Sequence, residues 1–390
     1  MNRTYLWVIT GIIIIVLAFV FHIPGFYIFL GIVLILLART FNPFRLSVEK
    51  IPEGFIEKQF NTGAVTLNYV EGPKNGPSLL FIPGQMEFWQ GYNLVLPYFS
   101  KKYHVFVVDV RGHGKSTFTP GKYSYNLIGE DLKLFLEQVI KERTIVSGLS
   151  SGGILSLWLA ANAPECVLTA IIEDPPYFSS IYPRIKEEKY MYYLFKTAIE
   201  TLGNGRRDIR SFFARQGIPL KDKENLLLMP SFIASYRSIS LALNKKIRPH
   251  KKYDLLNARF DQRAGLKFIS EYDVDFSKAT IDGRLTEGFD PEETLKKIQC
   301  PVLLIHAYWS RHKTWGLIGA LDDDDVEKIR SGLKDLKVVR VDAIHDVHLA
   351  KPKIFIKVIS EYLDNLMGLR NKLTPSGIQE QQMNNFLMIQ

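Results

Sequence analysis

One short stretch constrains the fold of this chain more than any other. The strand-like residues Thr144-Ile145-Val146-Ser147 lead directly into Gly148-Leu149-Ser150-Ser151-Gly152, and a helical pattern follows. The G-x-S-x-G spacing places Ser150 on a strand-to-helix turn so sharp that its backbone is strained, and the flanking glycines let strand and helix pack closely. We therefore expect Ser150 to be a nucleophile and the N–H of Ser151 to point at the oxyanion that its attack creates.

Elsewhere, short apolar runs of the strand type alternate with helical patterns. This alternation is typical of βαβ units and predicts an α/β fold with a mostly parallel central sheet. Residues 55–60 and 65–70 predict an opening hairpin that turns at Asn61-Thr62-Gly63. Further strands are expected at residues 78–82, 105–110, 144–146, 167–173, 302–306 and 337–341, and the main helices at 123–141, 153–163, 322–336 and 354–367.

One long interval interrupts the alternation. Residues 178–289 are helix-like and aromatic-rich, and they are too long for a loop. We expect them to form a helical cap inserted between two parts of the core, residues 51–177 and 290–368. The polar, Gln- and Asn-rich tail at 369–390 is expected to lack order.

The expected cap is strongly basic. Residues 178–288 contain 21 Lys and Arg against 13 Asp and Glu. The difference, 21 − 13 = +8, accounts for most of the net charge of +9. Such a surface can attract nucleic acid or anionic lipid, but the chain has no nucleic-acid recognition motif. If this surface has a partner, anionic lipid is therefore a better candidate than nucleic acid. The simpler interpretation, an excess of solvated lysines on helices, is the leading alternative.

The first 41 residues have the character of a membrane anchor. Residues 5–21 and 23–38 are uncharged and almost wholly apolar, and Pro24-Gly25 offers a break between them. One continuous helix over both runs would be about 51 Å long, which is too long for a hydrocarbon core of about 30 Å. We therefore expect a hairpin of two transmembrane helices.

The charges at the ends of these runs predict the topology. Arg3 precedes the first run, Arg39 and Arg45 follow the second, and the connection holds no Lys or Arg. A hairpin places all of these basic residues on the cytoplasmic side, so we expect a cell-membrane protein whose catalytic domain faces the cytoplasm. The alternatives are one span with an interfacial piece, or a cleaved signal peptide, although no small-x-small cleavage site ends the first run.

From Phe55 to Met367 the chain resembles the α/β-hydrolase superfamily, in particular its capped, serine esterase- or lipase-like members, and four stretches match in order. The nucleophile turn is one. Another, residues 79–86, is similar to the oxyanion loop after the third strand, and the resemblance implies that the N–H of Gln85 is the second oxyanion donor. Pro83 stands where the family often has histidine.

A third stretch, residues 109–116, resembles the family's D-x-R-G-x-G-x-S turn after the fourth strand. It ends like a phosphate-binding loop, but the required first glycine is Asp109, so we reject nucleotide binding. Asp109 is expected to form the turn. The fourth stretch, residues 342–348 followed by Lys351-Pro352, resembles the loop that carries the catalytic base, which implies that His345 is the base; His113 and His348 are the rivals.

The acid of the triad is the least determined residue. Most members of the family place it a few residues after the strand at 302–306, where this chain has Ser310. Some members carry it at the end of the preceding strand, which implies Asp174. Glu173 is an alternative, and so is the run Asp322, Asp323, Asp324 and Asp325, whose simpler interpretation is favourable charge in a helix's first turn.

The order Ser150, Asp174, His345 is the order of nucleophile, acid and base in this fold. It implies cleavage of a carboxylic ester, from a small molecule or a lipid, with no cofactor, and no His/Cys cluster has zinc spacing. The alternatives are acyl transfer, other serine-dependent chemistry of the fold, or a ligand-binding member without activity. Cys166 and Cys300 are expected to be free thiols, with a disulfide as the alternative. The oligomeric state stays open.

Overall fold

A computed structural model describes residues 46–203, 205, 207–220, 225–247, 249–254 and 258–373, together with positions 12, 13, 16, 17, 25, 30 and 31. The transmembrane hairpin expected at 1–41 lies outside these residues apart from the few isolated positions, as do residues 374–390 of the expected tail. Within the described residues, no helix is both long enough and apolar enough to cross a bilayer.

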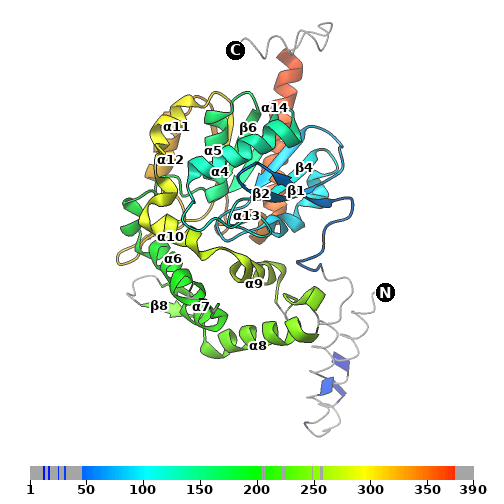
Figure 1. Ribbon diagram of the computed structural model, residues 1–390, viewed down its shortest axis with the longest axis vertical. Helices are drawn as coiled ribbons and strands as arrows, with labels where there is room; N and C mark the ends of the chain where they lie inside the picture. Colours follow the sequence, from blue (N-terminus) through cyan, green and yellow to red (C-terminus); the bar gives the residue numbers. More distant parts are fainter. Residues whose placement is uncertain are drawn as a thin grey trace.

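An eight-stranded sheet forms the centre of the molecule, in the order β1-β2-β4-β3-β5-β6-β9-β12 (Figure 1). β1 and β2 pair antiparallel, β2 and β4 do the same, and every later pair is parallel. The prediction of a mostly parallel α/β sheet is confirmed. The strands are β1 (Ile56–Asn61), β2 (Thr66–Glu71), β3 (Ser78–Ile82), β4 (His104–Asp109), β5 (Thr144–Leu149), β6 (Val167–Glu173), β9 (Val302–His306) and β12 (Leu336–Arg340).

Helices cover both faces of the sheet, which explains why every residue of β3, β5, β6 and β9 is buried. One apolar cluster includes α4 (Tyr125–Phe135), η2 (Leu136–Ile140), α5 (Ser151–Asn162), α11 (Pro291–Lys297) and α12 (Asp323–Gly332). A second cluster includes η1 (Trp89–Leu94), α3 (Leu96–Phe99), α13 (Val347–Ala350) and α14 (Pro352–Leu373).

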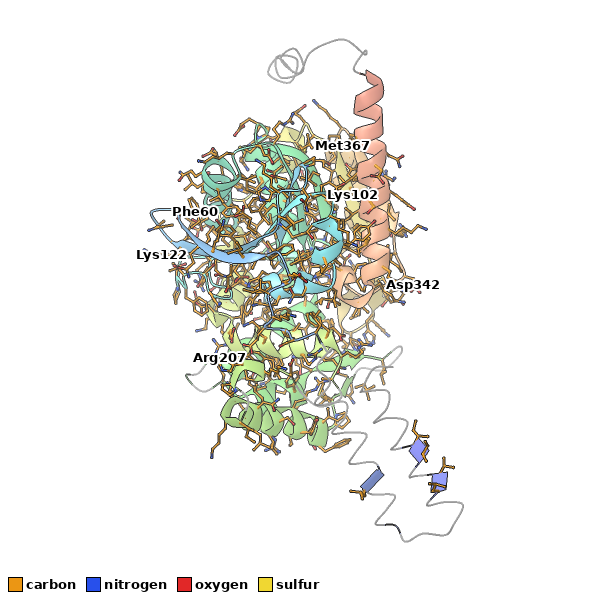
Figure 2. All side chains as sticks on the ribbon, turned by 90° about the vertical axis from the view of Figure 1, so that its right-hand side faces the viewer. Phe60, Lys102, Lys122, Arg207, Asp342 and Met367 are labelled. Carbon is orange, nitrogen blue, oxygen red and sulfur yellow. The ribbon has the colours of Figure 1, made fainter. Side chains whose placement is uncertain are left out.

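The helical insertion lies between β6 and β9, as expected, and extends away from the sheet (Figure 1). Arg207 in the insertion and Met367 on α14 lie towards opposite ends of the molecule (Figure 2). The helices of the insertion are η3 (Arg184–Lys186), α6 (Lys189–Leu202), α7 (Ile209–Arg215), α8 (Ser231–Ile247), η4 (Pro249–Lys251), α9 (Phe260–Glu271), α10 (Val274–Asp282) and η5 (Arg284–Thr286).

Two small hairpins are additional to the expected elements. One pairs β7 (Gly217–Pro219) with β8 (Leu226–Leu228), and the other pairs β10 (Ser310–His312) with β11 (Gly316–Ile318). Each strand has only three residues, which is too short to show an alternation of apolar and polar positions.

Hydrogen bonds join the insertion to the carboxyl ends of the central strands. The Asp273 N–H donates to the Gly112 carbonyl just after β4, at 3.0 Å. The Gln85 side chain, just after β3, donates to Ser277 Oγ on α10 at 3.1 Å. The insertion therefore covers the strand ends where the candidate catalytic residues lie.

Candidate active site

Ser150 occupies a strained turn between β5 and α5. Its backbone has φ 54° and ψ −120°, a left-handed φ that a serine rarely adopts and that costs of the order of 1–3 kcal/mol. A side chain at Gly148 would place its Cβ 2.1 Å from the Gly152 carbonyl oxygen, and one at Gly152 would meet the Ile82 oxygen at 2.1 Å. Both glycines are therefore needed for strand and helix to approach as closely as the motif predicts.

Asp174 and His345 meet at the carboxyl ends of the strands. The His345 ring donates from Nδ1 to Asp174 Oδ2 at 2.7 Å, and the Ala307 N–H donates to Asp174 Oδ1 at 3.2 Å. Asp174 is only 1% exposed. With Nδ1 protonated towards Asp174, the neutral ring keeps Nε2 as a proton acceptor.

The backbone ties Ser150 to the same place. Its N–H donates at 2.9 Å to the carbonyl of Glu173, the residue before Asp174. In the described part of the chain the Ser150 hydroxyl and the His345 ring do not share a hydrogen bond. Such bonds are often long without substrate and tighten when it binds.

The environment of His345 favours its charged form. Burial of the ring lowers the pKa of His345, but the hydrogen bond and the charge of Asp174, with the charges of Asp346 and Glu173, outweigh burial and raise it. The side chain is still 38% exposed, so one edge remains accessible. This combination suits a base that must hold a proton during the reaction.

Two backbone N–H groups are available as oxyanion donors. Ser151 is the first residue of α5, where an N–H has no partner within the helix, and Gln85 lies in the loop after β3. Neither N–H donates to another described residue. A Cβ at Gly84 would lie 3.1 Å from Ser150 Cβ, so this loop runs directly beside the nucleophile.

The Gln85 side chain is held by the cap. Besides donating to Ser277, it accepts a hydrogen bond from Thr280 Oγ1 at 3.0 Å. Tyr272 also hydrogen-bonds to Ser277. The oxyanion loop is thus fixed to α10 as well as to the core, a link that the sequence did not reveal.

His113 supports the oxyanion loop, and among the described residues it shares no hydrogen bond with Asp174 or His345. It is fully buried, its Nε2 accepts the Met86 N–H at 3.1 Å, and its Nδ1 donates to the Arg111 carbonyl at 3.2 Å. Burial lowers the pKa of His113 to about 4, so the ring stays neutral at neutral pH. Met86 itself has φ 65°, and this contact stabilises that conformation.

His348 lies in a second buried charged group, with Glu87 and Glu173. Its Nδ1 donates to Glu173 Oε2 at 2.9 Å and its Nε2 to Glu87 Oε1 at 3.0 Å, while the ring stacks on Tyr92. Burial opposes the charged ring, but the charges of the two glutamates raise the pKa of His348 well above its usual value. Glu87 also accepts the Gly84 N–H at 3.4 Å, so the group joins the oxyanion loop to the loop that carries His345.

The other acids singled out in the sequence, Asp322 and Asp325 as triad candidates and Asp109 as a turn former, have different partners. Asp322 caps α12 through the Asp325 N–H at 2.9 Å and accepts from Arg311 at 2.6 Å, and Asp325 pairs with Arg184. Asp109 is buried beneath the turn after β4 and accepts the Trp89 N–H at 2.7 Å. Burial raises the pKa of Asp109 to about 6, consistent with a turn-forming role.

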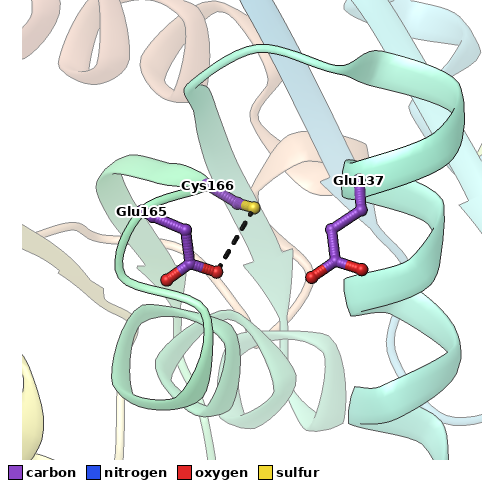
Figure 3. A group of neighbouring side chains, drawn as sticks. All are labelled: Glu137, Glu165 and Cys166. Carbon is purple, nitrogen blue, oxygen red and sulfur yellow. Dashed lines mark hydrogen bonds between the residues drawn. The ribbon is translucent and has the colours of Figure 1, made fainter.

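Both cysteines are free. Burial raises the pKa of Cys166 and of Cys300 to about 11, so both are protonated thiols at neutral pH. Cys166 lies beside Glu137 and Glu165, the one group of three possible metal ligands in the part of the chain that the structure describes (Figure 3). Its two carboxylates are exposed and its sulfur is protonated, so it is a poor metal site.

Comparisons with known proteins find relatives of this chain among hydrolases. The chain is 33% identical over 105 residues to 3-oxoadipate enol-lactonase 2 of Acinetobacter baylyi, covering 26% of this chain and 38% of that protein. It is 24% identical over 175 residues to epoxide hydrolase 2 of Caenorhabditis elegans, covering 41% and 49%. The chain thus spans less than half the length of these curated relatives.

Solved structures share the fold at low identity. Carboxylesterase CesB of Bacillus subtilis superposes with a TM-score of 0.55 at 18% identity, covering 81% of this chain and 93% of that one. A bacterial membrane phospholipase A superposes with a TM-score of 0.53 at 20% identity, covering 80% and 87%. The profile of the alpha/beta hydrolase fold matches residues 77–352, and the chain belongs to this family.

Proposed function

We propose that this protein is a membrane-anchored serine hydrolase that cleaves a carboxylic ester through Ser150, His345 and Asp174. The observation that carries the proposal is the 2.7 Å hydrogen bond between His345 and the buried Asp174, beside a serine held at φ 54°. A buried carboxylate on Nδ1 and a strained nucleophile turn are what acyl transfer by a serine needs.

The residues can perform the reaction without a further group. Ser150 Oγ attacks the ester carbonyl carbon while its proton passes to Nε2 of His345, and the N–H groups of Gln85 and Ser151 hold the oxyanion. His345 then gives the proton to the departing alcohol, and the acyl group stays bound to Ser150. Water attacks this acyl-enzyme with His345 as base, releasing the acid and restoring the serine.

The names of the relatives point to two substrate classes. A lactone is a cyclic ester, so the lactonase likeness agrees with acyl transfer. Epoxide hydrolysis in this fold uses an aspartate nucleophile, and the residue at the elbow here is Ser150. We therefore place this chain with the esterases and acyltransferases of the fold.

The membrane part of the proposal rests on the sequence of residues 1–41. Their two apolar runs and basic flanks support anchoring to the cell membrane with the catalytic domain in the cytoplasm. An enzyme at that location meets amphiphilic esters, so a lipid-like ester is the proposed substrate class.

A series of p-nitrophenyl esters of increasing acyl length tests the proposal on the purified full-length protein. We expect hydrolysis by the wild type and its loss in Ser150→Ala. Ser147→Ala is the matched control, because the Ser147 hydroxyl is buried without a hydrogen-bond partner among the described residues. Failure of a correctly folded wild type to cleave any ester would favour the alternative of a ligand-binding member without activity.

A further inference from the structure

Helix α8 exposes an apolar face to solvent. Its large apolar side chains recur at spacings of four, three, four and four residues, which places them on one side of a helix about 25 Å long. They are Phe232, Tyr236, Ile239, Leu243 and Ile247, called here the α8 face. Phe232 is 71% exposed and Ile247 is 70% exposed, whereas Ala234 and Leu241 on the opposite side are buried against the rest of the cap.

The hairpin before α8 exposes further apolar side chains. Ile218 in β7 and Leu227 and Leu228 in β8 are all exposed, and only two residues separate β8 from α8. Apolar side chains scattered singly on a surface need no explanation, but a contiguous group marks an interaction site.

Exposed lysines lie at the carboxyl-terminal end of α8, where Lys246 is next to the α8 face and Lys245 is on the side of Leu241. Lys245 and Lys246 in the last turn of α8 and Lys251 in η4 are exposed. In sequence, residues 245–252 carry five Lys and Arg and no acid. A helix with one apolar side and neighbouring lysines is the pattern that binds an anionic bilayer surface in its interfacial plane.

The N-terminal linker is fixed beside the same end of α8. The Leu46 carbonyl accepts from Arg263 Nη1 at 3.0 Å, and Arg263 also pairs with Asp254 at 2.7 Å. The Asp254 carbonyl in turn accepts from Asn244 of α8 at 3.2 Å. Glu49 of the linker lies 4.0 Å from Lys252.

This attachment limits how far α8 can lie from the apolar N-terminal sequence. The second apolar run ends at Ala38, eight residues before Leu46. Eight extended residues span at most about 29 Å. If the run enters a bilayer, the cap is therefore held close to that bilayer.

We propose that the α8 face docks on an anionic membrane surface, so that the cap lies against the bilayer. The inference rests on the proposed membrane anchoring and adds an orientation to it. Because α10 of the same cap binds Gln85 beside the nucleophile, a lipid ester leaving the bilayer would meet the cap next to the active site.

Lipid-dependent quenching tests the docking. The full-length protein, with Cys166→Ser and Cys300→Ser, is placed in nanodiscs of phosphatidylcholine and phosphatidylserine. An NBD fluorophore is attached to Leu243→Cys, or to Asn365→Cys on α14, two residues before Met367, which lies far from the insertion (Figure 2). We expect doxyl-labelled lipid to quench the label at 243 and to leave the label at 365 unchanged, with weaker quenching in discs without phosphatidylserine.

A matched pair of variants tests the apolar contact itself. Ile239→Ser in the Leu243-labelled protein should reduce the quenching, whereas Ile56→Ser on β1 should not. The pair is matched because Ile239 is 60% exposed and Ile56 is 61% exposed.

The other outcomes would overturn the docking, and each is distinct. Protein that enters the discs without quenching at 243 would leave the anchor intact and refute the docking. A label shielded from water but not quenched by lipid would show that residues 5–38 or a second copy cover the α8 face, and mass photometry separates these two. Ester hydrolysis is measured separately, so failure of the docking does not depend on failure of the catalytic proposal.

Discussion

Asp174→Asn removes one negative charge beside His345 and leaves the side chain nearly unchanged in shape. In the wild type, Asp174 Oδ1 accepts the Ala307 N–H and Oδ2 accepts the His345 Nδ1–H. Because the Ala307 N–H can only donate, the asparagine would turn its oxygen toward Ala307 and its NH2 group toward His345. The ring would then carry its proton on Nε2 and could not accept the proton of Ser150.

We expect this tautomer to lower kcat by about 10⁴-fold, as the same substitution does in a Ser-His-Asp protease. That factor corresponds to about 5.5 kcal/mol of lost transition-state stabilisation. The substitution also removes the charge that raises the pKa of His345. Since His345 must be neutral to act as base, kcat/KM of the wild type should rise with pH through a midpoint above about 6.5, and the midpoint should fall in the variant.

The assay is hydrolysis of the best p-nitrophenyl ester over a pH series. Asp322→Asn is the control, since Asp322 is also buried but caps α12 and binds Arg311. It should keep kcat within a few-fold of the wild type, because asparagine also caps helices well. An Asp174→Asn enzyme that keeps more than a tenth of kcat, or an Asp322→Asn enzyme that loses as much, would refute this assignment of the acid.

Three further substitutions test other parts of the site. His348→Ala should lower the free energy of unfolding by about 3–5 kcal/mol in urea denaturation, because it leaves Glu87 and Glu173 buried without their partner; an unchanged midpoint would contradict this. Gln85→Ala keeps the backbone N–H donor but loses the side-chain link to α10. Losing an oxyanion donor lowers kcat by about 10²–10³-fold, so this variant should lose less than that. A larger fall in kcat would show a direct role for the Gln85 side chain. Gly152→Ala should lower the melting temperature measured by scanning fluorimetry, since its Cβ would clash with a backbone oxygen, and a stable variant would mean that the elbow has more room than described.

The sheet could be predicted from sequence because its strands are local features. Each central strand is a run of apolar residues bounded by turn residues, and both faces are buried, so the pattern is strong. The elbow at Ser150 could be predicted for a similar reason, since two glycines and a strained serine must stand at fixed spacing. The hairpins β7–β8 and β10–β11 were missed because three-residue strands carry no such pattern.

The contacts among distant residues could not be predicted in the same way. Asp174 was one of several candidate acids, and only the three-dimensional approach to His345 separates it from Asp322. Glu87 has no motif around it, yet it pairs with His348, which is 261 positions away in the chain. Buried ion pairs of this kind depend on which loops meet, and a single sequence does not encode that as a local pattern.

Fluorophosphonate labelling followed by peptide mapping tests the central claim most directly, because the probe reacts only with an activated serine. The full-length protein is labelled beside Ser150→Ala, His345→Ala and Asp174→Asn, with Ser147→Ala as control. We expect one modified peptide that carries the probe on Ser150, no labelling in the first two variants and a steep loss in the third. A folded wild type that does not label, or a probe found on another serine, would contradict the assignment of Ser150 as the nucleophile.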